Sequence, residues 1–294
     1  MAETLLSLKS RLASIRSISK ITKAMKLVSS AKYTRVRAIY DSEKRYCDDM
    51  HDCFMLCLSN VDFSKKRRPT CMTEKSGNRD LYVFVSSTLG LCGAYNYDLY
   101  KVFLDNVKAE DDVVCIGEKG LRHFRDKVHK AYDDFVSIQS HLDLESANRL
   151  RHWLDNVYRQ GDYRSVRVIY TKFVNSITFK PMCERLIPIM DQDVLETMGP
   201  ASPTATKPIF DPNPYKVADA IVPHYFDAVI YNKLLESLLS EQASRRNSMD
   251  SATDSANELS DRLKISYNKL RQQKITQEIT EVVGGANATG GSGF

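Results

Sequence analysis

The sequence lacks the motifs that mark several large classes of protein. No run of 18 or more apolar residues occurs among its 294 residues, so no segment is predicted to cross a membrane. No Gly-Lys-Ser/Thr triplet is present, which excludes a Walker A phosphate loop. H-E-x-x-H and G-x-S-x-G are also absent, and the six histidines are scattered. We therefore expect no catalytic residue, no cofactor and no metal ion in this chain.

The seven cysteines are not spaced like zinc ligands. Cys47 and Cys53 would lie on different sides of one helix and cannot bridge within it. Cys53 and Cys57 would share one face of the helix and could bind a metal ion there. The favoured interpretation is that they act as small buried hydrophobic residues. We expect reduced thiols in a non-secretory compartment.

Positive charge is concentrated near the N-terminus. Residues 1–46 hold eleven Lys and Arg against three Asp and Glu. Such an excess seeks an anionic neighbour, which could be nucleic acid, lipid or an acidic protein surface. Residues 5–20 are basic and amphipathic like a transit peptide, but the same pattern continues to Tyr40. Any import signal is therefore expected to have been removed already.

Two long helices are predicted at opposite ends of the chain, over residues 5–58 and 215–283. At 1.5 Å per residue they would be about 80 and 100 Å long, so they must pair to remain stable in water. An antiparallel coiled coil is the expected arrangement, with a stammer in the first stripe. The apolar positions are Leu5, Leu8, Leu12, Ile15, Ile18, Ile21, Met25 and Val28, and in the second helix Met249, Ala252, Ala256, Leu259, Leu263 and Leu270.

The middle of the chain alternates between short apolar runs and helical patterns. Strands are predicted at residues 81–85, 113–116 and 166–173, and a hairpin strand at 176–189 with Pro181 at its edge. Helices are predicted at residues 97–108, 119–127 and 144–159. This alternation predicts a Rossmann-like α/β domain with a mainly parallel sheet.

These patterns divide the chain into five parts. They are a coiled-coil helix (1–59), an α/β domain (80–190), a linker (191–214), a second coiled-coil helix (215–283) and a flexible tail (284–294). Five prolines forbid a continuous helix in the linker, and Pro223 should kink or restart the second helix. The basic segment 60–79 is expected to be a solvated loop, with a nuclear or lipid address as the alternative.

A Gly-rich turn follows the first predicted strand, at Gly90–Gly93. Such turns can cradle phosphates, although this one lacks the full G-x-G-x-x-G spacing. A tight strand-to-helix turn is the favoured interpretation. Cys92 is a weaker candidate for a nucleophile, because no partner histidine or acid is implied nearby.

Four segments together resemble one known family. They are residues 20–33 (KITKAMKLVSSAKY), 87–96 (STLGLCGAYN), 240–250 (SEQASRRNSMD) and 267–281 (YNKLRQQKITQEITE). In this order, and across almost the whole chain, they resemble the γ subunit of F-type ATP synthases. The resemblance implies a non-catalytic rotary shaft that transmits torque between a proton-driven ring of c subunits and a hexamer of α and β subunits.

The resemblance also implies partner-binding residues. Lys20, Lys23, Met25 and Lys26 would lie near an acidic loop of the β subunit, opposite Arg245 on the partner helix. Arg271, Gln272 and Thr276 match the region where the family's shaft hydrogen-bonds a β loop. The α/β domain would contact the c-ring and the small δ/ε stalk subunits. A position on the matrix side of the mitochondrial inner membrane is preferred to a bacterial origin.

Two rival functions stay open from sequence. A nucleotide-dependent enzyme would use the Gly90–Gly93 turn and bind ligand as an isolated chain. A nucleic-acid-binding coiled coil would use residues 1–46, with affinity that falls steeply in salt. That second rival lacks a basic region on the second helix and aromatic residues for base stacking.

Overall fold

The computed structural model describes residues 4–60, 72–73, 75–160, 163–189 and 209–290. They belong to two compact units. The helical unit comprises residues 1–28 and 246–294, and the domain unit comprises residues 29–245. Two long helices, α1 (Leu5–Asn60) and α6 (Pro214–Gly290), contribute to both units. Among the described residues, none of the helices has the length and apolarity needed to span a bilayer.

The domain unit is built on a five-stranded sheet with strand order β3-β2-β1-β4-β5. The strands are β1 (Arg79–Val85), β2 (Asp112–Ile116), β3 (Lys130–Tyr132), β4 (Tyr163–Phe173) and β5 (Phe179–Ile187). The first four are parallel, and β5 runs antiparallel along β4 with Pro181 on the edge. The predicted mixed α/β class with a mainly parallel sheet is confirmed. Strand β3 was not predicted, because its three residues contain no apolar run.

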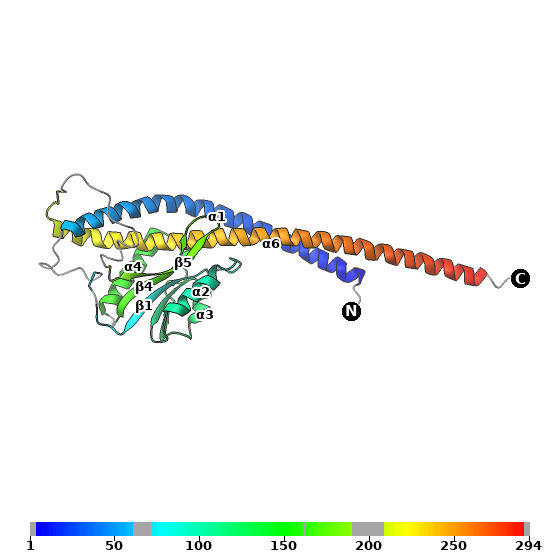
Figure 1. Cartoon of the computed structure of the whole chain (residues 1–294), viewed down its shortest axis with the longest axis horizontal. Helices are drawn as coiled ribbons and strands as arrows, with labels where there is room; N and C mark the ends of the chain where they lie inside the picture. Colours follow the sequence, from blue (N-terminus) through cyan, green and yellow to red (C-terminus); the bar gives the residue numbers. More distant parts are fainter. Residues whose placement is uncertain (1–3, 61–71, 74, 161–162, 190–208, 291–294) are drawn as a thin grey trace. The chain divides into compact units, whose positions relative to one another are not determined.

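Helices cover both faces of this sheet, as the side chains of β1 show. Tyr82 and Phe84 pack with α2 (Tyr95–Asn106) and α3 (Glu118–Phe124). Leu81, Val83 and Val85 point to the other face and pack with α4 (Leu144–Gln160) and with α6 (Figure 1). Alternation along one strand therefore fills two apolar cores, as expected for a buried parallel strand. A short 3-10 helix, Ile138–His141, precedes α4.

In the domain unit, α1 packs against the first part of α6 through aromatic residues. Phe54 stacks on Tyr225 with ring centroids 4.4 Å apart, and Tyr40 meets Phe173 of β4 edge-on at 6.1 Å. Tyr40 also donates a hydrogen bond of 2.9 Å to Glu236. These contacts bring α1, α6 and the sheet into a single core.

Helix α6 differs from the prediction at two places. It continues through Pro223 without a restart, and it extends to Gly290, beyond the expected start of the tail at residue 284. A proline inside a helix costs about 3 kcal/mol. Its neighbours Val222, Tyr225 and Phe226 are buried, and their burial outweighs that penalty. Most of the predicted linker and basic loop lies outside the described residues.

The described cysteines are free thiols. Cys47 and Cys57 are buried, as expected of small hydrophobic residues, but Cys53 is exposed. The three therefore do not form one buried face of α1. Among the residues that the structure describes, no cluster of His, Cys, Asp and Glu could hold a metal ion.

Candidate partner-binding surfaces

The seam of the helical unit contains both apolar and polar residues. Leu8, Met249, Ala256 and Leu263 are buried, as predicted for seam positions. Ser19 donates a hydrogen bond to Asn257 (2.7 Å), and Thr253 donates one to Thr22 (2.8 Å). Further along, the Lys26 ammonium lies 2.5 Å from Asp250. The predicted stammer through Ile18 and Ile21 is wrong, because Ser19 and Thr22 continue the spacing of three and four residues that Leu8, Leu12 and Ile15 begin.

Apolar residues lie on the outside of the same helix pair. Ile18, Ile21 and Val28 of α1 are 48%, 59% and 58% exposed. Leu259, one of the predicted seam residues of α6, is also exposed. An exposed stripe of large apolar side chains marks a surface that another protein covers. The other exposed members of this set are Leu6, Leu27, Ile265, Ile275, Ile279, Val282 and Val283.

The first group of expected contact residues lies on this pair. Lys20 and Lys23 are exposed, whereas Met25 and Lys26 are half-buried. Among these residues Lys26 contacts Asp250 of α6, and the neighbouring Thr22 accepts a hydrogen bond from Thr253, whereas the expected position opposite Arg245 stays a prediction. The Lys26–Asp250 pair is partly solvated, so it contributes only about 0.2–1 kcal/mol and leaves Lys26 free to exchange partners.

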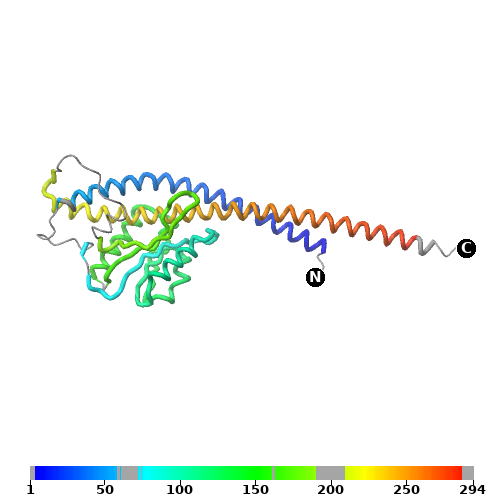
Figure 2. Tube along the Cα trace, viewed as in Figure 1, coloured from blue at the N-terminus to red at the C-terminus, as the bar shows by residue number. Residues whose placement is uncertain are grey.

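The second group lies on the last part of α6. Arg271, Gln272 and Thr276 are exposed, as is every residue from 271 to 286. Side-chain hydrogen bonds within this part of the helix include those from Gln277 to Glu281 and from Thr280 to the Thr276 carbonyl, both 2.8 Å. Figure 2 shows the orange part of α6 beside the start of α1, and the red part continuing past it. This stretch of α6 presents a bare surface.

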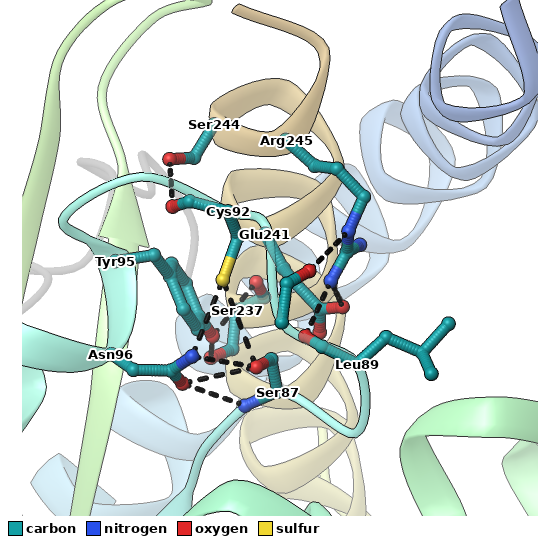
Figure 3. A network of polar contacts seen from close by, with 10 residues as sticks. Ser87, Leu89, Cys92, Tyr95, Asn96, Ser237, Glu241, Ser244 and Arg245 are labelled. Atoms are coloured by element: carbon teal, nitrogen blue, oxygen red, sulfur yellow. Dashed lines mark hydrogen bonds and ion pairs between the residues drawn. The ribbon is translucent and has the colours of Figure 1, made fainter. Parts of the chain in front are cut away.

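Arg245 belongs instead to the domain unit, where it is buried. Its guanidinium donates to the carbonyls of Leu89 (2.8 Å) and Gly90 (3.2 Å) and pairs with Glu241 at 2.7 Å (Figure 3). Burial raises the pKa of the Glu241 carboxyl, and the Arg245 charge opposes this shift. The second oxygen of Glu241 has no hydrogen-bond partner among the described residues. Arg245 therefore secures a turn of its own chain.

That turn is the Gly90–Gly93 segment, the candidate phosphate cradle. Its backbone carbonyls at Leu89 and Gly90 accept hydrogen bonds from Arg245, and the carbonyl of Cys92 accepts one from Ser244. Leu91 has a left-handed φ of 62°, which is uncommon for a residue other than glycine. Contacts from α6 fix this conformation. The turn is thus a tight strand-to-helix connection, which is the favoured interpretation from sequence.

Helix α6 also fills the place where related sheets bind ligands. In open α/β sheets that place is the crevice at the carboxyl ends of the strands, where the strand order reverses. Here the reversal lies between β1 and β4. Ser237 hydrogen-bonds Tyr95 after β1 (2.7 Å), and Ser240 donates to the Thr171 carbonyl of β4 (3.3 Å). Cys92, the candidate nucleophile, lies in the turn before α2. Burial raises the pKa of its thiol, which disfavours the reactive thiolate.

Sequence reasoning missed the serines and threonines that make these contacts. Ser19 and Thr22 lie in the seam of the helical unit, and Ser237, Ser240 and Ser244 lie on the buried face of α6. The available signal was their spacing of three and four residues, which matches a helix face. A search restricted to apolar residues could not detect it.

Fold and surfaces define a class of protein. The domain's ligand crevice is filled by its own helix, and the helix pair carries large apolar side chains on its outside. Such a chain is a non-catalytic subunit of a larger assembly. Comparison with known proteins agrees with this class and narrows it.

The family model described as ATP synthase matches residues 4–289. The ATP synthase gamma chain of Mycoplasma mycoides is 34% identical over 96% of this chain and 97% of its own length. The gamma chain of Mycoplasma mobile is 35% identical over 97% and 99%. A chain of the mitochondrial ATP synthase of Euglena gracilis shares the fold, with TM-score 0.67 and 16% identity over 99% of this chain and 97% of that one.

The chain belongs to the ATP synthase gamma chain family, the central-stalk rotor subunits of F-type ATP synthases. It is therefore not the catalytic subunit of that complex. Membership of the ATP synthase complex follows from the same matches.

Proposed function

We propose that the helical unit turns inside a collar of three α and three β subunits and carries torque between that collar and the c-ring. The observation that carries this proposal is that the helix pair has a seam of its own and yet exposes large apolar side chains such as Ile18, Ile21 and Val28. A lone asymmetric shaft presents a different face to each catalytic subunit. Its rotation then changes the affinity of each site in turn, which is a coupling between binding sites.

Lys20, Lys23, Met25 and Lys26 are proposed to face an acidic loop of the β subunit. Two exposed lysines beside exposed Ile21 offer charge and apolar surface together. A hydrogen bond to a charged group contributes about 1.5–3 kcal/mol, so a few of them can favour one rotary position without blocking the next. Arg245 is left out of this contact because its guanidinium already bonds the turn and Glu241.

Arg271, Gln272 and Thr276 are proposed to hydrogen-bond a second β loop. All three are exposed on the bare part of α6, on the same helix as exposed Ile275 and Ile279. Polar side chains next to apolar ones on one exposed helix suit a contact that forms and breaks with every step. The neutral members would each contribute about 1 kcal/mol.

The domain unit is proposed to bind the c-ring and the δ/ε stalk subunits. Helix α2 offers an exposed surface for such contacts. Tyr97 and Leu104 are exposed on it, and the Lys101 ammonium lies 4.4 Å from the centre of the Tyr97 ring. Apolar and cationic groups on one helix face suit a protein partner.

The compartment and the coupling ion are separate questions. The curated relatives named above are bacterial, so they give no support to the mitochondrial location expected from sequence. The proposed location is the membrane face that carries the c-ring.

Protons are the proposed coupling ion, although a relative that is 29% identical, from Acetobacterium woodii, is named sodium ion specific. ATP hydrolysis in native membranes that does not respond to sodium would support protons.

Native pull-down of this chain followed by mass spectrometry tests the proposal. We expect three α and three β subunits for each copy of the chain, together with the c subunit. Recovery of the chain alone, or with nucleic acid that dissociates in salt, would contradict it. Nucleotide binding to the isolated chain in equilibrium dialysis would favour the rival enzyme function.

Met25→Lys tests the proposed β contact in the assembled complex. The new ammonium should form a persistent contact with the acidic loop, and about 1.4 kcal/mol of extra binding would slow turnover about tenfold. Met25→Leu keeps the size and the apolar character, so it should leave turnover unchanged. Equal ATP hydrolysis rates and equal ion-pumping yields in Met25→Lys and wild type would refute the placement.

A further inference from the structure

The contact between α6 and the rest of the domain unit is polar over much of its length. From Lys233 to Arg245, five side chains of α6 hydrogen-bond the sheet or the turn after β1. We name this set the domain seam. Its members are Lys233, Ser237, Ser240, Ser244 and Arg245.

Each member has a definite partner in the domain unit. Ser237 and Ser240 contact Tyr95 and the carbonyl of Thr171, and Ser244 donates to the carbonyl of Cys92 at 2.7 Å. The partners of these three serines lie on α2, on β4 and in the turn after β1. Consequently the serines alone tie α6 to a helix, a strand and a turn.

Lys233 is at the other end of the seam and belongs to a buried network. Its ammonium contacts Glu184 of β5 and the Tyr170 hydroxyl of β4. Tyr170 donates to Glu184 at 3.0 Å, and nearby Tyr40 of α1 donates to Glu236 of α6. This network connects both long helices to the edge of the sheet.

The physical character of the seam has a consequence for a helix that must transmit torque. The hydrophobic effect is non-directional, so it specifies the rotational register of a helix less sharply than hydrogen bonds do. Hydrogen bonds weaken steeply when their angles change. Rolling α6 would break several of them at once and leave buried polar groups without partners. Ser237, Ser240 and Ser244 are small and buried, so the backbones also approach closely.

We propose that the domain seam is the element that makes α6 and the α/β domain turn as one body, so that its residues are positioning residues for torque transmission. The proposal rests on the rotor function above and assigns the rigidity of the coupling to named side chains. The apolar core stabilises the fold, whereas the seam fixes the rotational register of α6 against the domain.

Two seam variants separate an effect on the rotational register of α6 from an effect on the stability of the fold. Ser237→Ala/Ser240→Ala/Ser244→Ala removes three hydroxyls without adding volume. Lys233→Met/Tyr170→Phe/Glu184→Leu replaces the buried ion pair and the hydroxyl bonded to it with apolar residues of similar size, a change that is often neutral or stabilising. The control is Thr34→Ala/Ser42→Ala/Ser140→Ala, which removes three exposed hydroxyls from the same unit.

The measurement is the angular fluctuation of a bead attached to helix α2 in the stalled complex of this chain with α and β subunits. We expect the mean-square fluctuation to rise at least twofold in both seam variants and to stay at the wild-type value in the control. ATP hydrolysis should stay within twofold of wild type in all three. The thermal midpoint of Lys233→Met/Tyr170→Phe/Glu184→Leu should not fall. A larger fluctuation without a loss of thermal stability is not expected if these residues only stabilise the fold.

The outcomes distinguish the two proposals. Wild-type rotation with unchanged fluctuation in both seam variants would overturn the seam proposal and leave the rotor function intact. Absence of ATP-driven rotation in the wild-type complex would overturn the rotor function, and the seam proposal would fail with it.

Discussion

Two stretches of the same helix, α6, have opposite surroundings. Residues 233–245 are buried apart from half-buried Leu238, and their polar groups bond the chain's own domain. Residues 271–286 are exposed throughout, and their side-chain hydrogen bonds include those between Gln277 and Glu281 and between Thr280 and Thr276 of the same helix. The first stretch is covered by its own chain, whereas the second is the surface proposed to bind another protein. A single helix thus combines an internal support with an exposed surface.

The largest expected effect on stability comes from removing one arginine from each stretch. Arg245→Ala leaves the Glu241 carboxylate buried without its partner, so the free energy of unfolding should fall by about 3–5 kcal/mol. Arg271→Ala removes an exposed side chain and should change it by less than about 0.5 kcal/mol. Urea denaturation of both variants measures the difference. Equal losses would erase the distinction between the two stretches.

A second pair of substitutions compares apolar residues. Leu234 is fully buried beside Val83, Leu150 and Ile230, and Leu234→Ala should reduce the free energy of unfolding by about 2–5 kcal/mol. Ile279 is 59% exposed, and Ile279→Ala should change it by less than about 0.5 kcal/mol. Thermal melts of the isolated chain would measure both. A large loss in Ile279→Ala would mean that its side chain packs within the chain.

The buried network predicts a pH dependence. Burial raises the pKa of Glu236 above its usual 4.5, against a hydrogen bond from Tyr40 and the charges of Lys233 and Lys172. Between 4.5 and the raised pKa, the folded chain keeps a proton that the unfolded chain releases. The free energy of unfolding should therefore fall as pH rises through this window.

Glu236→Gln keeps an acceptor for Tyr40 and removes the titration. Relative to wild type, this variant should gain stability as the pH rises from 4.5. Denaturation at a series of pH values gives the difference curve, in which the titration of Glu241 is common to both proteins and cancels. A difference that does not vary with pH would show that Glu236 titrates normally.

The smallest effect is expected in the seam of the helical unit. Thr22→Val/Thr253→Val replaces both partners of a buried hydrogen bond with side chains of the same shape, so stability should change by less than about 0.5 kcal/mol or rise slightly. Ala252→Asp, which adds a charge to a half-buried seam position, serves as the destabilising comparison. Helix content followed during heating would distinguish the two.

The sequence was sufficient for β1, β2 and β4, because they are apolar runs that few other structures accommodate, but not for the short strand β3. It was sufficient for only part of the helical unit, where Leu8, Met249, Ala256 and Leu263 are buried as predicted. Ile18, Ile21 and Val28 were assigned to the seam, and the structure exposes them. The assignment assumed that apolar residues face the chain's own helix. That assumption fails where a second protein supplies the covering surface.

The candidate site residues differ in how well their positions could be predicted from the sequence. Exposure of Lys20, Lys23, Arg271, Gln272 and Thr276 agrees with a role in binding, which stays a prediction. Arg245 was assigned with them, yet its guanidinium serves the turn at Leu89 and Gly90. A sequence motif indicates that an arginine has a role, but not whether it contacts a partner subunit or a turn of its own chain. That choice depends on the packing of segments about 150 residues apart.

The most direct test is hydrogen exchange of the chain alone and in complex with α and β subunits. Amides of residues 233–245 should be protected in both states, because their surroundings come from the chain itself. Amides of residues 271–286 should exchange rapidly in the isolated chain and become protected on assembly. The same slow or the same rapid exchange of residues 271–286 in both states would contradict the account.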